Sequence, residues 1–211
     1  MTRGTVAAVV LAAGRGSRFG GQSSKVIADL GGRPVVQWVL DAAVASGLGP
    51  VVLVVGNHAD EVAACATPGV EVVRNERWAD GISTSLGAAL RALAARGIVH
   101  AAVIGLGDQP RVGAEAWRRV AAAYDAGAPL AVATYGGVRG NPVLVGRDLW
   151  PAALALEGDE GARQLMRSHP VVEVDCDGTG DPTDIDTPEQ LALLETTQTE
   201  STWRRSPTAS E

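Results

Sequence analysis

The sequence predicts an α/β protein, with a single doubly wound domain and a mostly parallel sheet. Apolar, β-branched segments at 6–13, 50–56 and 100–106 are typical of strands that are covered on both faces. Helical patterns alternate with these strands, at 34–46 and 82–96 among others, and this alternation favours parallel pairing through right-handed crossovers. A chain of 211 residues is long enough for one such domain with a sizeable core.

The composition indicates an acidic globular protein. Hydrophobic residues make up 46% of the chain and charged residues 20%, which excludes a disordered chain. The net charge of −6 argues against a general nucleic-acid-binding protein. Cys65 and Cys176 show neither metal-ligand nor redox spacing, so we expect two reduced thiols. We recognise no signal peptide before the first strand and no apolar run that could span a bilayer, so we expect a cytoplasmic protein without membrane contact.

The remaining elements follow in chain order. Strands are predicted at 70–73, 130–135, 141–145 and 171–174, and helices at 57–65, 113–127, 156–165 and from 188 onwards. The strands on either side of 136–140 predict a small antiparallel hairpin, and Pro142 indicates that the second strand lies at a sheet edge. Thr187 is expected to cap the last helix, with Pro188 at its first position. Apolar periodicity ends after Leu194, which predicts a domain over 1–195 and a disordered tail over 196–211.

The first strand leads into a loop that is rich in glycine and positive charge. Residues 14–21 are GRGSRFGG. Glycine allows positive φ and leaves backbone N–H groups accessible, and such a loop after a strand can cradle a chain of phosphates. Arg15, Arg18 and Lys25 add positive charge to the same region. We therefore expect a polyphosphate to bind here.

This loop has three other interpretations. The first is an ordinary flexible loop. A P-loop is excluded, because the stretch from Gly20 to Lys25 lacks the second glycine and is not followed by Ser or Thr. A dinucleotide-binding loop stays open, since Gly14, Gly16 and Gly20 match its glycine pattern loosely, although the loop does not run directly into a helix.

Asp108 comes directly after the strand at 100–106. The carboxyl ends of central strands are where ligands bind in open α/β sheets. Mg²⁺ prefers one or two carboxylates together with phosphate oxygens and water, so Asp108 fits a magnesium ligand. The alternative is an acid that stabilises the turn before Pro110. Ser83 and Ser85 have two interpretations as well: they cap the helix that starts there, or they hold a base and ribose.

Four motifs in succession resemble those of the MobA-like NTP transferases, the nucleotidyltransferases of the molybdenum-cofactor branch. They lie at 11–25 (LAAGRGSRFGGQSSK), 75–86 (NERWADGISTSL), 105–110 (GLGDQP) and 184–189 (DIDTPE). The resemblance implies that the nucleotide is bound by Leu11, Ala12, Ala13, Gly14, Gly16, Ser17, Arg18, Lys25, Gly81, Ser83, Ser85 and Asp108. It implies that the catalytic residues are Arg18, Lys25 and Asp108. It also implies that Asp108 and Asp186 hold Mg²⁺, with Asp184, on the same face of an extended segment, as the alternative to Asp186.

Two further segments resemble acceptor-binding parts of the same family. Asn141 and Pro142 belong to a strand similar to the family's G-x-P-V strand, with Asn where His is often found. Asp159, Gly161 and Arg163 belong to a segment similar to GDxGAR. The resemblance implies that these residues bind the acceptor. A well-capped surface helix is the alternative for the second segment.

The function implied by the resemblance is Mg²⁺-dependent nucleotidyl transfer with release of pyrophosphate. Ala13 in LAAG resembles the cytidylyl branch, whereas the guanylyl branch usually shows LAGG. This favours CTP as the nucleotide and molybdopterin as the acceptor, with a molybdoenzyme or a chaperone as a candidate partner. The alternatives are a guanylyl- or sugar-phosphate nucleotidyltransferase, a dinucleotide-dependent oxidoreductase, and a non-catalytic nucleotide-binding protein.

Overall fold

A seven-stranded sheet forms the centre of the computed structural model, which describes residues 5–14, 16 and 24–203, with side chains as far as 196. The strand order is β3-β2-β1-β4-β6-β5-β7. β6 runs antiparallel to β4 and β5, and the other neighbouring strands pair in parallel. The strands are β1 (Thr5–Ala12), β2 (Val51–Val55), β3 (Val70–Arg74), β4 (Val99–Leu106), β5 (Leu130–Tyr135), β6 (Val138–Gly146) and β7 (Val172–Asp175). The predicted doubly wound, mostly parallel sheet with an antiparallel excursion is confirmed.

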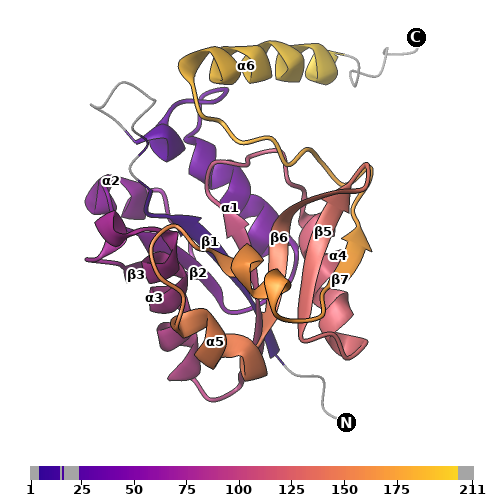
Figure 1. Cartoon of the computed structure of the whole chain (residues 1–211). Coiled ribbons are helices and arrows are strands. Elements are labelled where there is room, and N and C mark those ends of the chain that lie inside the picture. Colours follow the sequence, from indigo (N-terminus) through magenta and orange to yellow (C-terminus); the bar gives the residue numbers. More distant parts are fainter. Residues whose placement is uncertain (1–4, 15, 17–23, 204–211) are drawn as a thin grey trace.

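Helices cover both faces of this sheet (Figure 1). Side chains alternate along β1, so that Ala8 and Val10 pack on one face and Ala7 and Val9 on the other. α1 and α4 bury their apolar sides on the first face, and α3 and α5 on the second. The helices are α1 (Val35–Ala45), α2 (Ala59–Ala63), α3 (Ile82–Ala94), α4 (Ala114–Asp125), α5 (Trp150–Leu154) and α6 (Pro188–Trp203), with 3₁₀ turns η2 (Lys25–Ile27), η3 (Trp78–Asp80), η4 (Arg147–Leu149) and η5 (Ala162–Arg167).

The prediction that Pro142 marks an edge strand is wrong, because β6 lies between β4 and β5. Proline is tolerated there for a local reason. The pairing of β6 with β4 ends at Val143, and its register with β5 shifts between Val132 and Thr134. Pro142 therefore lies at an irregularity of the ladder, where its missing N–H group costs little.

The helix predicted at 156–165 is also wrong in its boundaries. α5 begins earlier, at Trp150, and a short 3₁₀ helix forms only from Ala162. Between them the chain is a loop in which Gly158 has a φ of +57°. The carbonyl of Gly158 accepts a hydrogen bond from the N–H group of Ser83 at 3.1 Å. A contact with α3 that is remote in sequence thus holds this segment in a non-helical form.

α6 packs outside the two main layers, next to the carboxyl ends of the parallel strands (Figure 1). Leu194 packs with Leu30, Val35 and Ile185 in a separate small core. The helix continues to Trp203, where the sequence predicts no regular structure from 196. Once a turn exists, each added residue gains a hydrogen bond, so a helix can extend beyond the residues that anchor it. The predicted tail from 204 lies outside the described residues.

The start of α6 is capped as predicted. The N–H group of Gln190 donates to the Oγ1 atom of Thr187 at 3.3 Å, while Oε1 of Gln190 accepts from the N–H groups of Asp186 and Thr187. This reciprocal arrangement is a capping box. Across the part of the chain that the structure describes, none of the helices combines the length and apolarity needed to cross a membrane.

Candidate active site

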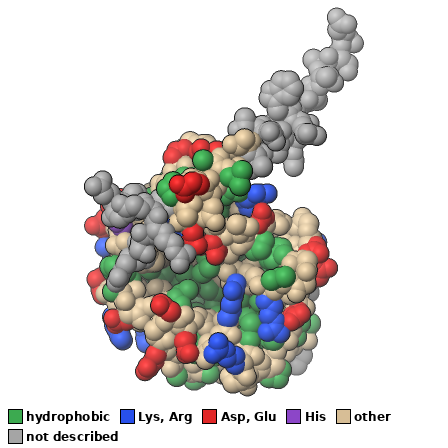
Figure 2. Space-filling model, turned by 45° about the horizontal axis from the view of Figure 1, so that its top comes forward, with side chains coloured by type: hydrophobic (Ala, Val, Ile, Leu, Met, Phe, Trp, Pro, Cys, Tyr) green, Lys and Arg blue, Asp and Glu red, His purple; other side chains and the backbone are tan. Residues whose placement is uncertain are grey.

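The carboxyl ends of β1 and β4 and the start of α3 line a pocket of about 500 Å³. In a parallel sheet these ends meet at one edge, where ligands bind. Viewed toward this edge, apolar side chains lie in the middle of the face, with acidic and basic side chains around them (Figure 2). The lining residues are Leu11, Ala12, Ala13, Gly14, Gly16, Lys25, Val26, Trp78, Ala79, Gly81, Ile82, Ser85, Leu106, Asp108 and Asp159.

Lys25 joins two carboxylates at one end of the pocket. It is the only lysine in the sequence. Its Nζ atom lies 2.6 Å from Oδ2 of Asp108 and 2.7 Å from Oδ1 of Asp186. Burial alone would lower the pKa of the Lys25 ammonium, but the charges and hydrogen bonds of Asp108 and Asp186 outweigh burial and raise the pKa. Lys25 is therefore a charged group in a partly buried position.

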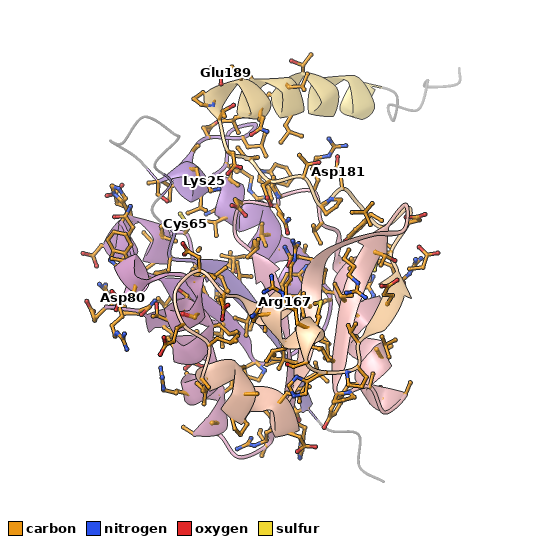
Figure 3. All side chains as sticks on the ribbon, in the orientation of Figure 1. Lys25, Cys65, Asp80, Arg167, Asp181 and Glu189 are labelled. Atoms are coloured by element: carbon orange, nitrogen blue, oxygen red, sulfur yellow. The ribbon has the colours of Figure 1, made fainter. Side chains whose placement is uncertain are left out.

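The segment at 181–186 is laid across the end of β4. The N–H group of Ile185 donates to the carbonyl of Asp108 at 2.9 Å, and the Ile185 side chain is fully buried. This places Asp184 and Asp186 on the side of Asp108. Figure 3 shows Lys25 and Asp181 in the same zone, between the sheet and α6.

The carboxylates of Asp108 and Asp186 fit a divalent cation that also binds phosphate. Both lie near enough to share one ammonium, and Oδ1 of Asp108 is buried without a hydrogen-bond partner in the described structure. Mg²⁺ is held by one or two carboxylates plus substrate phosphates in such sites. The described residues contain no group of three or more His, Cys, Asp or Glu that could hold a metal by itself. A cation here would thus depend on the phosphates of a ligand.

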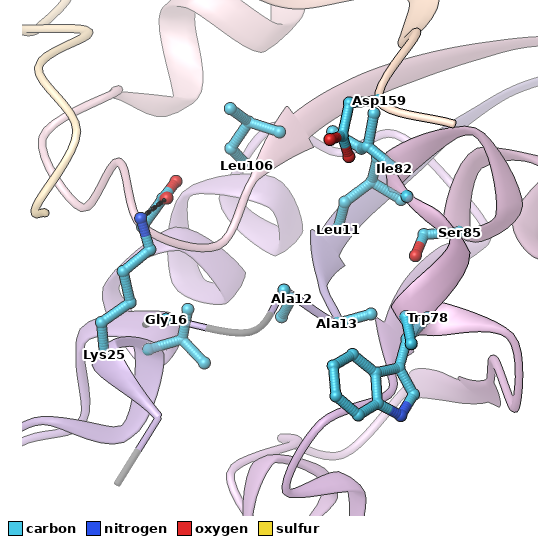
Figure 4. Close-up of a pocket in the computed structure, with 15 residues that line it drawn as sticks. Leu11, Ala12, Ala13, Gly16, Lys25, Trp78, Ile82, Ser85, Leu106 and Asp159 are labelled. Atoms are coloured by element: carbon cyan, nitrogen blue, oxygen red, sulfur yellow. Dashed lines mark ion pairs between the residues drawn. The ribbon is translucent and has the colours of Figure 1, made fainter. Parts of the chain in front are cut away.

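Trp78 and Ser85 lie at the opposite end of the pocket from Lys25 (Figure 4). Asn75 orders this end: its Nδ2 atom donates to Oγ1 of Thr84 and to Oγ of Ser85, both at 2.9 Å. The helix-capping interpretation of Ser83 and Ser85 is wrong, because the N-cap of α3 is Gly81 and no side chain caps it.

Ser83 and Ser85 face different cavities. Ser85 lines the main pocket, whereas Ser83 lines a separate polar cavity on the far side of the 157–159 loop. The hydroxyl of Ser83 is buried and has no hydrogen-bond partner in the described part of the chain. The structure therefore brings Ser85 into the candidate site and leaves Ser83 outside it.

Gly81 permits a close approach of two loops. Its φ is +108°, and a Cβ atom at this position would lie 2.2 Å from the carbonyl carbon and oxygen of Gly158. Only glycine satisfies both the conformation and the contact. Through this contact the 157–161 loop forms a wall of the pocket and presents Asp159 to it.

A second pocket, of about 250 Å³, adjoins the first and shares Leu11, Ile82, Leu106 and Asp159 with it. Of the residues assigned to the acceptor by resemblance, this pocket is lined by Asn141, Asp159, Gly161 and Arg163, and Pro142 is not among its lining. Asp184 lines it as well. We name this second cavity the acceptor pocket.

Most of the nucleotide residues expected from the sequence line the first pocket, apart from Ser83. Ser17 and Arg18 lie outside the described residues. Sequence reasoning did not assign Trp78, Ala79, Ile82, Leu106 or Val26 to the site. Trp78 stands in the same motif as Gly81, and its position in that motif was the available signal. The apolar residues follow strand and helix patterns that are indistinguishable from those of core residues.

Comparisons with known proteins agree with this architecture. The family described as "MobA-like NTP transferase domain" matches residues 8–174. Nicotine blue oxidoreductase of Paenarthrobacter nicotinovorans is 31% identical over 202 residues, which cover 90% of this chain and 96% of that protein. The bifunctional protein GlmU of an Anaeromyxobacter species is 42% identical over 139 residues, which cover 61% of this chain and 27% of GlmU.

Solved structures share this fold. Rv0371c of Mycobacterium tuberculosis is 32% identical, with a TM-score of 0.79, over 92% of this chain and 100% of that one. A further Rv0371c structure, at 30% identity and a TM-score of 0.74 over 92% of this chain and 99% of that one, is a complex with manganese. The chain belongs to the family of MobA-like NTP transferase domains, and thus to the nucleotidyltransferases.

Proposed function

We propose that this chain transfers CMP from CTP to a phosphorylated acceptor, molybdopterin, with release of pyrophosphate. The observation that carries the proposal is the position of Lys25. It lies with Asp108 and Asp186 at one end of a pocket whose other end is formed by Trp78 and Ser85. A nucleoside triphosphate has the same polarity, with charge at one end and a planar base at the other.

The nucleotide is oriented by this asymmetry. The triphosphate lies against the backbone of Gly14 and Gly16 and the ammonium of Lys25, because preorganised N–H groups and a buried cation stabilise phosphate charge. Arg18 is assigned to the phosphates by its motif alone. The base lies toward Trp78 and Ser85, which offer an aromatic face and a hydroxyl.

The reaction needs no covalent intermediate with the protein. An oxygen of the acceptor phosphate attacks the α-phosphorus, a new P–O bond forms, and the bond to the β-phosphate oxygen breaks. Pyrophosphate leaves with that electron pair. Lys25 stabilises the charge that moves onto the phosphate oxygens, and the remaining role of the site is to position the reactants.

Asp108 and Asp186 are the residues that would hold Mg²⁺ in this reaction. The cation, when bound, neutralises phosphate charge. The manganese complex of Rv0371c supports a divalent cation in a relative of this chain. Its identity here as Mg²⁺ is part of the proposal.

The acceptor lies in the adjoining pocket, against Asn141, Asp159, Gly161 and Arg163. The two pockets share a wall, so a phosphate of the acceptor can meet the α-phosphate at their junction. The choice of cytosine rests on Ala13, which resembles the cytidylyl branch. A guanylyl- or sugar-phosphate transferase would use the same machinery.

A second candidate is an oxidoreductase that binds a dinucleotide in the same pocket. The observation that favours it is the name of one relative, nicotine blue oxidoreductase, which this chain matches over 96% of that protein's length. Against it, the acid that follows the loop at about the spacing of a dinucleotide ribose contact, Asp41, lies on α1 and pairs with Arg33.

Label transfer separates these functions. CTP labelled at the α-phosphate is incubated with molybdopterin and Mg²⁺, and the acceptor is isolated. The proposal predicts label on the acceptor, in an amount equal to the pyrophosphate formed. A label that stays entirely with CTP or with free CMP, together with oxidation of a nicotinamide cofactor, would instead support the oxidoreductase.

A further inference from the structure

Three polar side chains form a continuous hydrogen-bonded chain along one wall of the acceptor pocket. Nδ2 of Asn141 donates to Oε1 of Gln109 at 3.2 Å. Nε2 of Gln109 donates to Oδ1 of Asp184 at 2.7 Å and to the carbonyl of Pro182 at 2.6 Å. Gln109 is 3% exposed and Asn141 is 7% exposed, so both amides are removed from solvent.

The carbonyl of Pro182 determines which group donates and which accepts in each of these hydrogen bonds. A backbone carbonyl can only accept, so the NH₂ group of Gln109 must face Pro182 and Asp184. Its Oε1 atom then faces Asn141, which must present its own NH₂ group. The orientation of both buried amides thus follows from one carbonyl.

The consequence concerns the atoms that remain for a ligand. Oδ1 of Asn141 and Oδ2 of Asp184 receive no hydrogen bond from any described residue, and both residues line the acceptor pocket. Each of these atoms is an acceptor.

The rest of the acceptor pocket is mostly apolar, and its other charged residues are Asp159 and Arg163. Its floor includes Leu86, Ile104 and Val143, and Arg163 lies at its exposed rim. A volume of about 250 Å³ is smaller than that of a site for a whole nucleotide. The cavity therefore suits a small planar ring with an apolar face and hydrogen-bond donors on one edge.

We infer that Gln109 is a positioning residue that holds Asn141 and Asp184 with oxygen atoms toward the acceptor pocket, so that this wall selects ring systems whose edge carries N–H donors. The inference deepens the proposed function and rests on it for the identity of the second cavity. It concerns the acceptor and is independent of which nucleotide is bound.

Two fluorescent bicyclic rings provide the test. Pterin carries an amino group at position 2, whereas lumazine has the same ring frame with a carbonyl there. An acceptor that faces position 2 pairs with the amino group of pterin, whereas in lumazine it faces a carbonyl and stays unpaired. We therefore expect wild-type protein to bind pterin at least about tenfold more tightly than lumazine. Fluorescence titration gives both dissociation constants.

Gln109→Met is the central variant, because Met has a similar length and lacks both the donor and the acceptor. It should reduce the pterin preference to about twofold or less, with CTP affinity unchanged. Gln37→Met on α1, away from the pocket, is the matched control and should keep the preference. Should Gln109→Met melt before it can be measured, Asn141→Leu removes the acceptor oxygen and should give the same result.

The outcomes separate the inference from the proposed function. Equal binding of the two rings by wild-type protein, binding of neither, or an unchanged preference in Gln109→Met would overturn the inference. Loss of the preference in Gln109→Met with CTP affinity retained supports it. Absence of CTP binding, together with the expected pterin results, would overturn the proposed function while leaving the role of Gln109 in place.

Discussion

The ammonium of Lys25 lies 2.6 Å from the carboxylate of Asp108, and both groups are largely shielded from solvent. The two residues follow different strands, β1 and β4, which are neighbours in the sheet. In the absence of nucleotide, Lys25 neutralises Asp108 and Asp186. In the proposed reaction, a nucleotide with its cation would offer the carboxylates a different partner and would offer Lys25 a phosphate. Binding would then exchange one set of charge pairs for another.

Replacing Lys25 by Met should lower kcat by about 10²–10³-fold, because it removes one preorganised cation from the phosphate charge. Lys25→Arg keeps the positive charge, so its kcat should fall less than that of Lys25→Met. The thermal midpoint of Lys25→Met should also fall, since two carboxylates lose their shared partner, and Mg²⁺ should restore part of it. Steady-state kinetics and thermal melts measure both effects. A Lys25→Met protein with unchanged kcat would contradict the assignment.

Asp108→Asn should weaken the binding of Mg²⁺ that the reaction needs. The substitution keeps the size of the side chain and removes the charge that a cation needs, so the Mg²⁺ concentration for half-maximal rate should rise and kcat should fall by about 10²-fold or more. Asp41→Asn removes an exposed carboxylate on α1 that pairs with Arg33, and it should leave both kcat and the Mg²⁺ requirement unchanged. Measuring the rate as a function of Mg²⁺ concentration distinguishes the variants. Wild-type behaviour of Asp108→Asn would exclude Asp108 as a metal ligand.

Gly81→Ala should destabilise the protein and disturb the nucleotide pocket. The new Cβ atom would collide with Gly158 and sit at positive φ, for a combined cost of about 2–4 kcal/mol. Gly127→Ala is the matched control, because φ is +91° there but nothing lies within 4 Å of the added atom. It should cost only about 1 kcal/mol from the backbone conformation. Urea unfolding measures the loss of stability in both variants. Equal losses in Gly81→Ala and Gly127→Ala would show that the contact with Gly158 is unimportant.

The pH dependence of stability should report on Asp181. Burial raises the pKa of this carboxyl, but the hydrogen bonds from Thr183 and the charge of Arg111 outweigh burial and lower it below 3.8. Because its pKa is lower in the folded state, the ionised carboxylate of Asp181 stabilises the fold above pH 3.8. This contribution is lost as the pH falls through the pKa of the folded state. Thr183→Val removes the hydroxyl donor at 2.5 Å and should cost up to about 1 kcal/mol at pH 6, since the pair is partly exposed.

Urea unfolding at pH 6 and at pH 2 tests this sign. The difference between wild type and Thr183→Val should shrink at the lower pH, because the carboxyl of Asp181 takes up a proton as the pH falls through its lowered folded-state pKa. A difference that is equal at the two pH values would show that Thr183 acts through packing rather than through the charge of Asp181.

The approach of Lys25 to Asp108 follows from features visible in the sequence. A glycine-rich loop after one buried strand and an acid after another place both groups at the same edge of a parallel sheet. The capped start of α6 is equally local, because Thr187 and Gln190 are close in the chain.

Other parts of the site depend on contacts that no local pattern encodes. The loop at 157–161 takes its form from Gly81 and Ser83, which are remote in sequence, so its helical composition was misleading. β6 can lie inside the sheet because a register shift in its pairing with β5 accommodates Pro142. The orientation of Asn141 depends on a carbonyl at Pro182. Each of these features becomes visible only when distant segments are brought together.

Pyrophosphate release tests the central claim most directly. CTP, GTP, ATP and UTP are each incubated with molybdopterin, with and without Mg²⁺, using wild-type protein and Asp108→Asn. The account predicts release with CTP that depends on both the acceptor and Mg²⁺ and that falls by about 10²-fold or more in Asp108→Asn. Release with GTP alone would keep the mechanism and overturn the assignment of Ala13 to cytosine. No release with any nucleotide, despite tight binding of CTP, would contradict nucleotidyl transfer to this acceptor.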